Sequence, residues 1–197
     1  MPKIIEVIKG DITSQKVHAI VNAAHDGLTG GGGVDGAIHK AAGSLMTGEC
    51  MNLPKDDKGE RCKVGECRMT SGYNLSALYI IHTVGPVWRG GKFGERTDLA
   101  RCYYNCFLMA EMQGLRSIAF PCISTGAFAL PKNIAAKIAV DAIKNSFTSY
   151  AEQEKYGEPE KNCSISLVRF VCFDQENYDE YMKIMPKGYE EVENGKG

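Results

Sequence analysis

Short apolar segments that alternate with longer amphipathic segments constrain the fold of this chain most strongly. Near-continuous apolar runs are typical of strands covered on both faces, and apolar residues spaced three or four apart predict helices. Strands are predicted at residues 3–8, 17–21, 67–70, 79–84, 117–121 and 164–172, and helices at 34–42, 96–113, 133–147 and 177–184. This alternation indicates an α/β fold, a three-layer α/β/α sandwich with a mostly parallel sheet.

The length of 197 residues suits a single domain with a sizeable core. We expect one domain over residues 1–186, polar surface segments at 52–65 and 151–162, and a frayed tail at 187–197. The first residues run straight into a short, charged strand instead of a signal peptide, and no apolar run approaches the roughly 18 residues of a transmembrane helix. We therefore expect a cytoplasmic protein without a membrane partner.

The net charge of −1 argues against a nucleic-acid partner bound through phosphate neutralisation. A small phosphate ligand stays compatible with this charge, because backbone N–H groups hold phosphates without lysine or arginine. The eight cysteines form no C-x-x-C pair, so we interpret them as reduced thiols. A metal site from Cys50, Cys62, Cys67 and a histidine has irregular spacing, and we predict neither a metal nor a cofactor.

Four loops follow strands at what would be one edge of the sheet. In open α/β sheets, ligands bind outside the carboxyl ends of the strands. Three of these loops place polar or glycine-rich residues directly after an apolar strand, which predicts a binding site there. The four loops are residues 10–13, 22–35, 122–130 and 173–177.

The glycine run at residues 30–33 contains a literal G-x-G-x-x-G at Gly31, Gly33 and Gly36. That motif suggests an NAD-dependent oxidoreductase, but the loop before it is long and no acidic residue ends a strand about 20 residues later. The narrower inference is an anion site, where the glycine backbone and a helix N-terminus approach a ligand closely. A flexible surface loop is the alternative.

A second loop, residues 123–128, follows the buried strand and again offers backbone donors ahead of a helix. Two such loops facing each other would clamp a diphosphate. A plain strand-to-helix connection with a Ser/Thr cap is the alternative.

Several side chains near these loops are candidates for binding or chemistry. Asp11 would accept from an exocyclic amine or cap a short helical turn. Asp35 and His39 share one helix face, so Asp35 would act as a base or water-orienting group, or serve as a cap beside a packed histidine. His25 would titrate near neutral pH or be a solvated loop residue. Phe173 would stack on a base or belong to the core.

Taken in order, these segments resemble the macrodomain family, and within it the MacroD-type branch. The resemblance spans nearly the whole chain and implies a six-stranded mixed, mostly parallel sheet and an ADP-ribose ligand. The resembling segments are GDIT (10–13), AIVNAA (19–24), GGGGVDGAIHKAA (30–42), IHTVGP (81–86), IAFPCISTG (118–126) and FVCFDQENY (170–178).

The resemblance also implies residue roles. Asp11 would contact the adenine amine, Phe173 would stack on adenine, and Phe128 would lie beside the distal ribose. The complete implied binding set is Asp11, Ile12, Asn22, Gly31, Gly32, Gly33, Val34, Ser124, Thr125, Gly126, Ala127, Phe128 and Phe173.

MacroD-type members remove mono-ADP-ribose from acidic protein side chains and deacetylate O-acetyl-ADP-ribose. The resemblance implies a water held by the ligand phosphate and Asp35, and we predict Asp35, His25 and His39 as the catalytic residues. The expected partners are ADP-ribose or O-acetyl-ADP-ribose and mono-ADP-ribosylated proteins. The chain departs from the family pattern at His25, where an asparagine is usual, and at Ala129-Leu130. We expect a hydrolase, and the His25 replacement favours a non-catalytic ADP-ribose reader as the alternative.

Overall fold

A computed structural model describes residues 2–155 and 163–192 of the chain, and the side chains of residues 150–155 are not described. Within these ranges seven strands form one sheet in the order β3-β4-β2-β5-β6-β1-β7. The five inner strands are parallel to their neighbours, and the edge strands β3 and β7 are antiparallel. The strands are β1 (Lys3–Lys9), β2 (Ala19–Ala24), β3 (Cys67–Ser71), β4 (Tyr79–Val84), β5 (Ser117–Pro121), β6 (Leu167–Cys172) and β7 (Tyr189–Val192).

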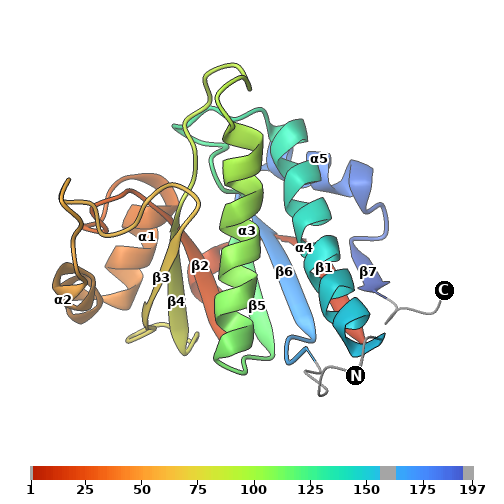
Figure 1. Cartoon of the computed structure of the whole chain (residues 1–197), viewed down its shortest axis with the longest axis horizontal. Helices are drawn as coiled ribbons and strands as arrows, with labels where there is room; N and C mark the ends of the chain where they lie inside the picture. Colours follow the sequence, from red (N-terminus) through yellow and green to blue (C-terminus); the bar gives the residue numbers. More distant parts are fainter. Residues whose placement is uncertain (1, 156–162, 193–197) are drawn as a thin grey trace.

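Helices cover both faces of this sheet, which confirms the predicted three-layer sandwich. The helices α3, α4 and α5 share one hydrophobic core with the sheet, and η1, α1 and α2 share a second core on the opposite face. Figure 1 shows α3 and α4 crossing in front of the strands. The helices are η1 (Ile12–Ser14), α1 (Gly33–Ala42), α2 (Ser44–Asn52), α3 (Glu95–Met112), α4 (Lys132–Lys155) and α5 (Gln175–Ile184).

The patterns that predicted these elements are visible in their burial. Every residue of β5 is buried, as expected for a central strand with helices on both sides. Helix α3 buries Leu99, Cys102, Tyr103, Cys106 and Phe107, which are spaced three or four apart and so share one stripe of the helix.

The structure differs from the sequence prediction at three elements. Residues 189–192 form the edge strand β7 instead of a frayed tail, so the sheet has seven strands instead of six. Its alternating exposure left no apolar run to recognise. Residues 151–155 continue α4, where a loop was predicted, and the rest of that predicted loop (156–162) lies outside the described residues. Helix α2 was not predicted, because its apolar residues do not share one face: Met46 and Cys50 are buried, whereas Leu45 and Met51 are exposed.

Among the described residues, no helix has the length and apolar character needed to cross a membrane. The eight cysteines are all free in the structure, and seven of them are buried. The described part of the chain holds no group of three or more His, Cys, Asp or Glu side chains placed to bind a metal ion.

Candidate functional site

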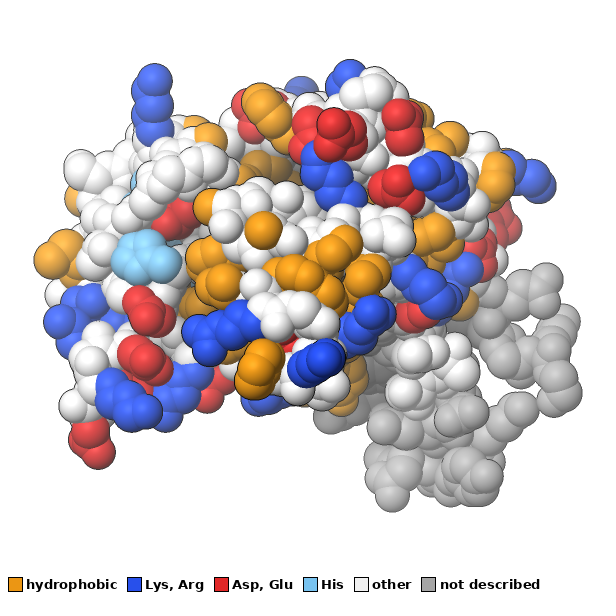
Figure 2. Space-filling view, turned by 90° about the horizontal axis from the view of Figure 1, so that it is seen from above, with side chains coloured by type: hydrophobic (Ala, Val, Ile, Leu, Met, Phe, Trp, Pro, Cys, Tyr) orange, Lys and Arg blue, Asp and Glu red, His pale blue; other side chains and the backbone are white. Residues whose placement is uncertain are grey.

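A continuous cleft crosses the edge of the sheet where the parallel strands end. Its first half is a cavity of about 420 Å³ lined by residues 10–12, the start of α1 and the ends of β5 and β6. Its second half, about 320 Å³, lies between residues 31–35 and 122–128. The two halves share Gly33, Val34, Cys122 and Gly126. Figure 2 shows hydrophobic side chains gathered in the centre of this face, with charged side chains around them.

We call residues 30–33 the first loop. Gly30 and Gly33 have φ of +85° and +58°, a left-handed conformation that favours glycine. A Cβ at Gly36 would lie 2.4 Å from the Gly31 carbonyl oxygen, so α1 and the loop approach each other closely only because Gly36 has no side chain. Gly32 has open space around it and no such requirement. Because Gly32 has no side chain, the cleft side of the first loop is open to a ligand.

The first loop ends at the N-terminus of α1. Gly32 is the N-cap, and no side chain in the described part of the chain caps the helix. The first N–H groups of an α-helix have no intrahelical acceptor, and the helix dipole favours an anion there. Since Gly33 and Val34 line both halves of the cleft, this helix end favours an anion at the middle of the cleft. The structure places Gly31, Gly32, Gly33 and Val34 on the cleft wall, and their contact with a phosphate stays a prediction.

We call residues 124–128 the second loop, which forms the opposite wall. Ser124 has φ +65°, and its buried Oγ has no hydrogen-bond partner among the described residues. A Cβ at Gly85 would lie 2.2 Å from that oxygen, so Gly85 makes room for Ser124. Leu130 N–H donates to the Ser124 carbonyl at 2.9 Å, and Thr125 Oγ1 donates to the Cys122 carbonyl at 2.9 Å. These bonds fix the loop against the end of β5.

Ala129 takes φ +55°, the conformation that a glycine would hold more easily. The left-handed region disfavours an alanine by about 1–2 kcal/mol, and a glycine adds about 0.5–1 kcal/mol of unfolded-state entropy. We therefore expect Ala129→Gly to raise the free energy of unfolding by about 0.5–1 kcal/mol in urea denaturation. Ala127→Gly is the control, because Ala127 is not among the described residues with positive φ. Glycine relieves no strain there, so this substitution should slightly lower the free energy of unfolding. Equal effects of the two substitutions would contradict this account of the loop.

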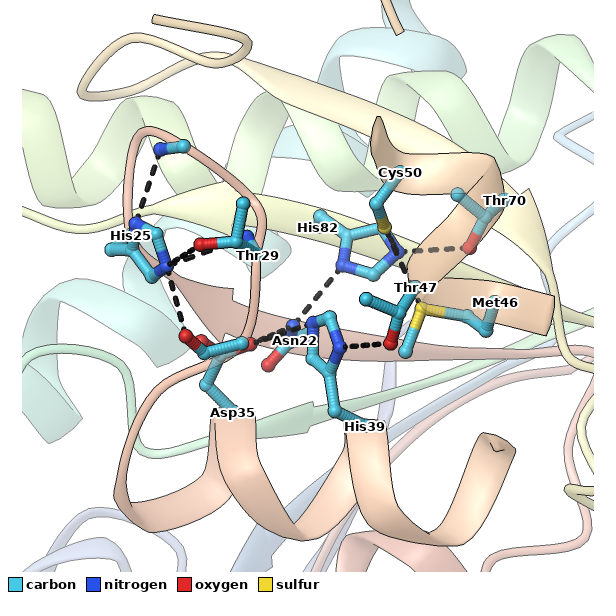
Figure 3. Close-up of polar contacts among 12 residues, drawn as sticks. Asn22, His25, Thr29, Asp35, His39, Met46, Thr47, Cys50, Thr70 and His82 are labelled. Carbon is cyan, nitrogen blue, oxygen red and sulfur yellow. Dashed lines mark hydrogen bonds and ion pairs between the residues drawn. The ribbon is translucent and has the colours of Figure 1, made fainter. Parts of the chain in front are cut away.

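A buried polar network lies under the second half of the cleft (Figure 3). Asn22 lies on β2 and donates from Nδ2 to Asp35 Oδ1 at 2.7 Å. The same Nδ2 lies 3.1 Å from His82 Nδ1, on the neighbouring strand β4. Asp35 Oδ2 is buried without a partner among the described residues, and the Asp35 side chain lines the cleft. The network therefore fixes one carboxylate oxygen and leaves the other to accept a donor from the cleft.

His39 lies behind Asp35, one helical turn further along α1. Its Nε2 is 3.4 Å from Asp35 Oδ1, and its Nδ1 is 2.9 Å from Thr47 Oγ1 on α2. Neither His39 nor Asn22 lines the described cavities, so both hold Asp35 in place from the protein side. Direct contact of Asn22 with a ribose stays a prediction.

His82 is the member of this network that the sequence analysis did not single out. It is completely buried, and its Nε2 lies 2.8 Å from Thr70 Oγ1. Burial and, second, the nearby His39 lower the pKa of the His82 imidazole to about 3. The neutral ring accepts from Asn22 at Nδ1 and donates to Thr70 at Nε2. The sequence signal that could have identified His82 is its position inside the largely apolar strand β4.

This lowered pKa predicts a pH-dependent stability. Between the unfolded pKa of 6.5 and the folded value of about 3, His82 takes up a proton only when the chain unfolds. The contribution of neutral His82 to the free energy of unfolding is therefore intact above pH 6.5. Below that pH it is lost at about 1.4 kcal/mol per pH unit. In His82→Gln the amide keeps one acceptor and one donor but does not titrate. The free energy of unfolding, measured by urea denaturation between pH 5.5 and 4.5, should fall less steeply with pH in this variant than in the wild type. Equal pH dependence in the two proteins would contradict the lowered pKa of His82.

His25 lies at the far end of the cleft, directly after β2. Gly27 N–H donates to its Nδ1 at 3.1 Å, and its Nε2 lies 3.1 Å from the Gly30 carbonyl. Thr29 Oγ1 is also 3.1 Å from Nε2. The ring thus braces residues 25–30, and both of its nitrogens are engaged by that loop. His25 and Asp35 still flank the same point, since a Cβ at Gly31 would lie 3.7 Å from His25 Cδ2 and 3.2 Å from Asp35 Oδ2.

The first half of the cleft has an exposed aromatic at its rim. Phe173, which follows β6, is 81% exposed, so the core alternative for this residue is wrong. Asp11 lines the same cavity beside the buried Ile12. It also caps η1, accepting from Thr13 N–H at 2.8 Å on Oδ1, which was the structural alternative for Asp11.

Two further residues of this half were missed by the sequence analysis. Asp174 is the N-cap of α5 and accepts from Asn177 N–H at 2.8 Å. The buried Asn177 donates from Nδ2 to Asp174 Oδ2 at 2.8 Å, and its Oδ1 has no partner among the described residues. Both side chains line the cavity. The Asp-x-x-Asn spacing at a helix start was the signal that could have found them.

These features define a class of protein, a three-layer α/β/α domain that binds an elongated, anionic, nucleotide-like ligand across the carboxyl ends of its strands. A family model for the Macro domain matches residues 21–139. The chain belongs to the Macro domain family. Residues 25–32 separate β2 from α1, so the tight turn of a dinucleotide fold is absent there.

Individual proteins of known name or structure agree with this membership. The chain is 44% identical to O-acetyl-ADP-ribose deacetylase 1 of Pantoea vagans over 183 residues, 93% of this chain and 99% of that protein. It is 36% identical to the Oceanobacillus iheyensis macrodomain with ADP, with a TM-score of 0.79 and 95% of each chain covered. It is 37% identical to the Trypanosoma brucei macrodomain in complex with ADP-ribose, with a TM-score of 0.75, covering 92% of this chain and 68% of that one.

Proposed function

We propose that this protein binds ADP-ribose along the cleft and hydrolyses an ester carried by the distal ribose. Adenine lies between Asp11 and Phe173, and the diphosphate lies between the first and second loops. The distal ribose lies at Phe128 and Asp35. The observation that carries the proposal is the buried Asp35 Oδ2, which has no partner among the described residues and lies in a cleft whose centre is a helix N-terminus.

The reaction follows from that placement. A water between the ligand phosphate and Asp35 attacks the acyl carbon, and its oxygen forms the new bond as the ester C–O bond breaks. The proton passes through the Asp35 carboxylate to the departing ribose hydroxyl, so the products are ADP-ribose and a carboxylic acid. A positioned general base of this kind contributes about 10²–10⁴-fold in rate. The likeness to a protein named O-acetyl-ADP-ribose deacetylase supports an acetyl ester as substrate.

The proposal includes a second substrate, mono-ADP-ribose attached through an ester to aspartate or glutamate of a protein. The same bond type is broken there, with the protein carboxylate as the acid product. Its partners are accordingly O-acetyl-ADP-ribose and mono-ADP-ribosylated proteins.

A non-catalytic reader of ADP-ribose is the second candidate, and the geometry of His25 favours it. Both ring nitrogens are engaged by residues 27–30, so the ring offers no free donor to a ribose or a water. In the hydrolase, Asp35 and the ligand phosphate hold the water, and His25 shapes the loop.

The test compares binding with turnover. Calorimetry with ADP-ribose should show saturable binding that Asp11→Ala weakens about 10- to 100-fold, since a hydrogen bond to a charged group contributes about 1.5–3 kcal/mol. Release of ADP-ribose from a mono-ADP-ribosylated protein and of acetate from O-acetyl-ADP-ribose is then measured for the wild type and His25→Asn. The absence of heat with ADP-ribose refutes the binding function. Turnover by His25→Asn alone refutes the hydrolase and leaves the reader.

A further inference from the structure

A groove of about 320 Å³ continues the cleft beyond Phe128. It shares His25, Gly85 and Phe128 with the second half of the cleft, so the three cavities follow one another along the sheet edge. We call this third cavity the side groove. Its remaining walls come from Asp26, from Val64 and from the segment between β4 and α3.

The side groove exposes large apolar side chains. Phe93 is 70% exposed, Val87 46% and Val64 41%, and all three line the groove. Scattered apolar side chains on a surface need no explanation, but several that line one concavity mark a contact site. Asp26 and Asp98 add two carboxylates to the lining, and Arg89 adds one guanidinium.

The wall of the groove that carries Phe93 is held rigidly. The buried Glu95 carboxylate accepts N–H bonds from Arg89 at 2.8 Å, Gly91 at 3.1 Å and Phe93 at 2.7 Å. Burial raises the pKa of this carboxyl, but the backbone donors outweigh burial and lower the pKa to about 2. The carboxylate therefore stays charged and keeps the loop closed around it at neutral pH.

The same wall is joined to the second loop. Trp88 N–H donates to the Phe128 carbonyl at 2.9 Å, and the Arg96 guanidinium lies 5.9 Å from the centre of the Trp88 ring. The groove and the distal end of the cleft thus form one preordered surface, which lowers the entropic cost of binding a partner.

We propose that the side groove binds the polypeptide segment next to the ADP-ribosylated residue, with an apolar side chain seated on Phe93 and Val87 and a basic side chain facing Asp26 and Asp98. This inference rests on the proposed function, because it places the distal ribose at Phe128. Any group attached to that ribose leaves the cleft through the surface shared by His25, Gly85 and Phe128.

The size of the groove decides between the two ester substrates. An acetyl group occupies about as much space as two waters, roughly 60 Å³ at about 30 Å³ per water. A groove of about 320 Å³ is several times larger and leaves room for amino-acid side chains of a polypeptide. The groove therefore selects among modified proteins and adds nothing for the acetyl ester.

The test uses calorimetry with three probes. They are ADP-ribose, a short Leu- and Lys-containing peptide that carries ADP-ribose on a non-hydrolysable amide link, and the same peptide with Asp in place of Leu and Lys. The variant is Phe93→Asp. Leu45→Asp on α2 is the matched control, because Leu45 is 72% exposed and does not line the groove. Thermal denaturation confirms that both variants fold.

The wild type and Leu45→Asp should bind the Leu/Lys peptide about tenfold more tightly than ADP-ribose, as burial of one apolar side chain provides. In Phe93→Asp that preference should vanish, while affinity for ADP-ribose stays within about twofold. Equal affinity of the wild type for all three probes would overturn the proposal that the side groove binds the polypeptide. An equal loss of affinity for all three probes in Phe93→Asp would overturn it as well. If ADP-ribose itself does not bind, the proposed function is refuted, and the role proposed for the side groove is refuted with it.

Discussion

Asp35→Asn should lower the rate of ester hydrolysis by about 10²–10³-fold, and affinity for ADP-ribose should change by less than about threefold. The amide oxygen still accepts from Asn22 Nδ2, so the network under the cleft keeps its geometry. The group in place of Oδ2 becomes a donor and no longer accepts a proton from water. The loss therefore falls on kcat, with KM nearly unchanged.

The measurement is acetate release from O-acetyl-ADP-ribose under saturating substrate, with calorimetry of ADP-ribose on the same samples. Asp141→Asn is the matched control, since it makes the same change on an exposed carboxylate of α4 that is paired only with Lys137 among the described ion pairs. A variant that retains more than about a tenth of the wild-type kcat would remove Asp35 from the role of base. A parallel loss of binding would show that Asp35 acts structurally.

Gly36→Ala should weaken ADP-ribose binding by about 10- to 100-fold, although alanine is the better helix former. The new Cβ would lie 2.4 Å from the Gly31 carbonyl oxygen, a backbone atom that moves only if the first loop moves. A displaced loop loses at least one N–H bond to a charged phosphate, which contributes about 1.5–3 kcal/mol.

Gly48→Ala is the control for helix propensity. Gly48 lies inside α2 with nothing within 4 Å of a built Cβ, so alanine there should raise the free energy of unfolding by about 0.5–1 kcal/mol. Binding of ADP-ribose to that variant should match the wild type. If Gly36→Ala behaves like Gly48→Ala in both assays, the first loop does not depend on the close approach of α1.

The sequence constrained the backbone of the candidate site most where one residue type has one physical use. The glycines at 30, 33 and 36 are required by backbone conformation or close approach, and the structure places all three in or beside the first loop. The helix start that follows them identified the anion site. The literal G-x-G-x-x-G pointed to NAD, because a short sequence motif does not fix the length of the loop before it.

Side chains with several possible partners could not be assigned from the sequence. Asp11 both caps η1 and lines the cleft, so its two readings were never exclusive. His25 looked like a catalytic group, yet its nitrogens are engaged by its own loop. His82 gave almost no signal, since a buried neutral histidine becomes visible only when Asn22 and Thr70 are seen beside it.

The sequence by itself determined the layered α/β fold and the two glycine-containing loops, because apolar periodicity and glycine conformation act over short distances along the chain. The family followed from the resemblance of six segments in their order along the chain. Tertiary structure decided which side chains meet. Asp35, Asn22 and His82 come from α1, β2 and β4. The parallel pairing of β2 with β4 places Asn22 beside His82, and the packing of α1 on the sheet brings Asp35 to Asn22. The side groove has the same origin, since Val64, Phe93 and Phe128 are far apart in sequence and line one surface only in the folded chain.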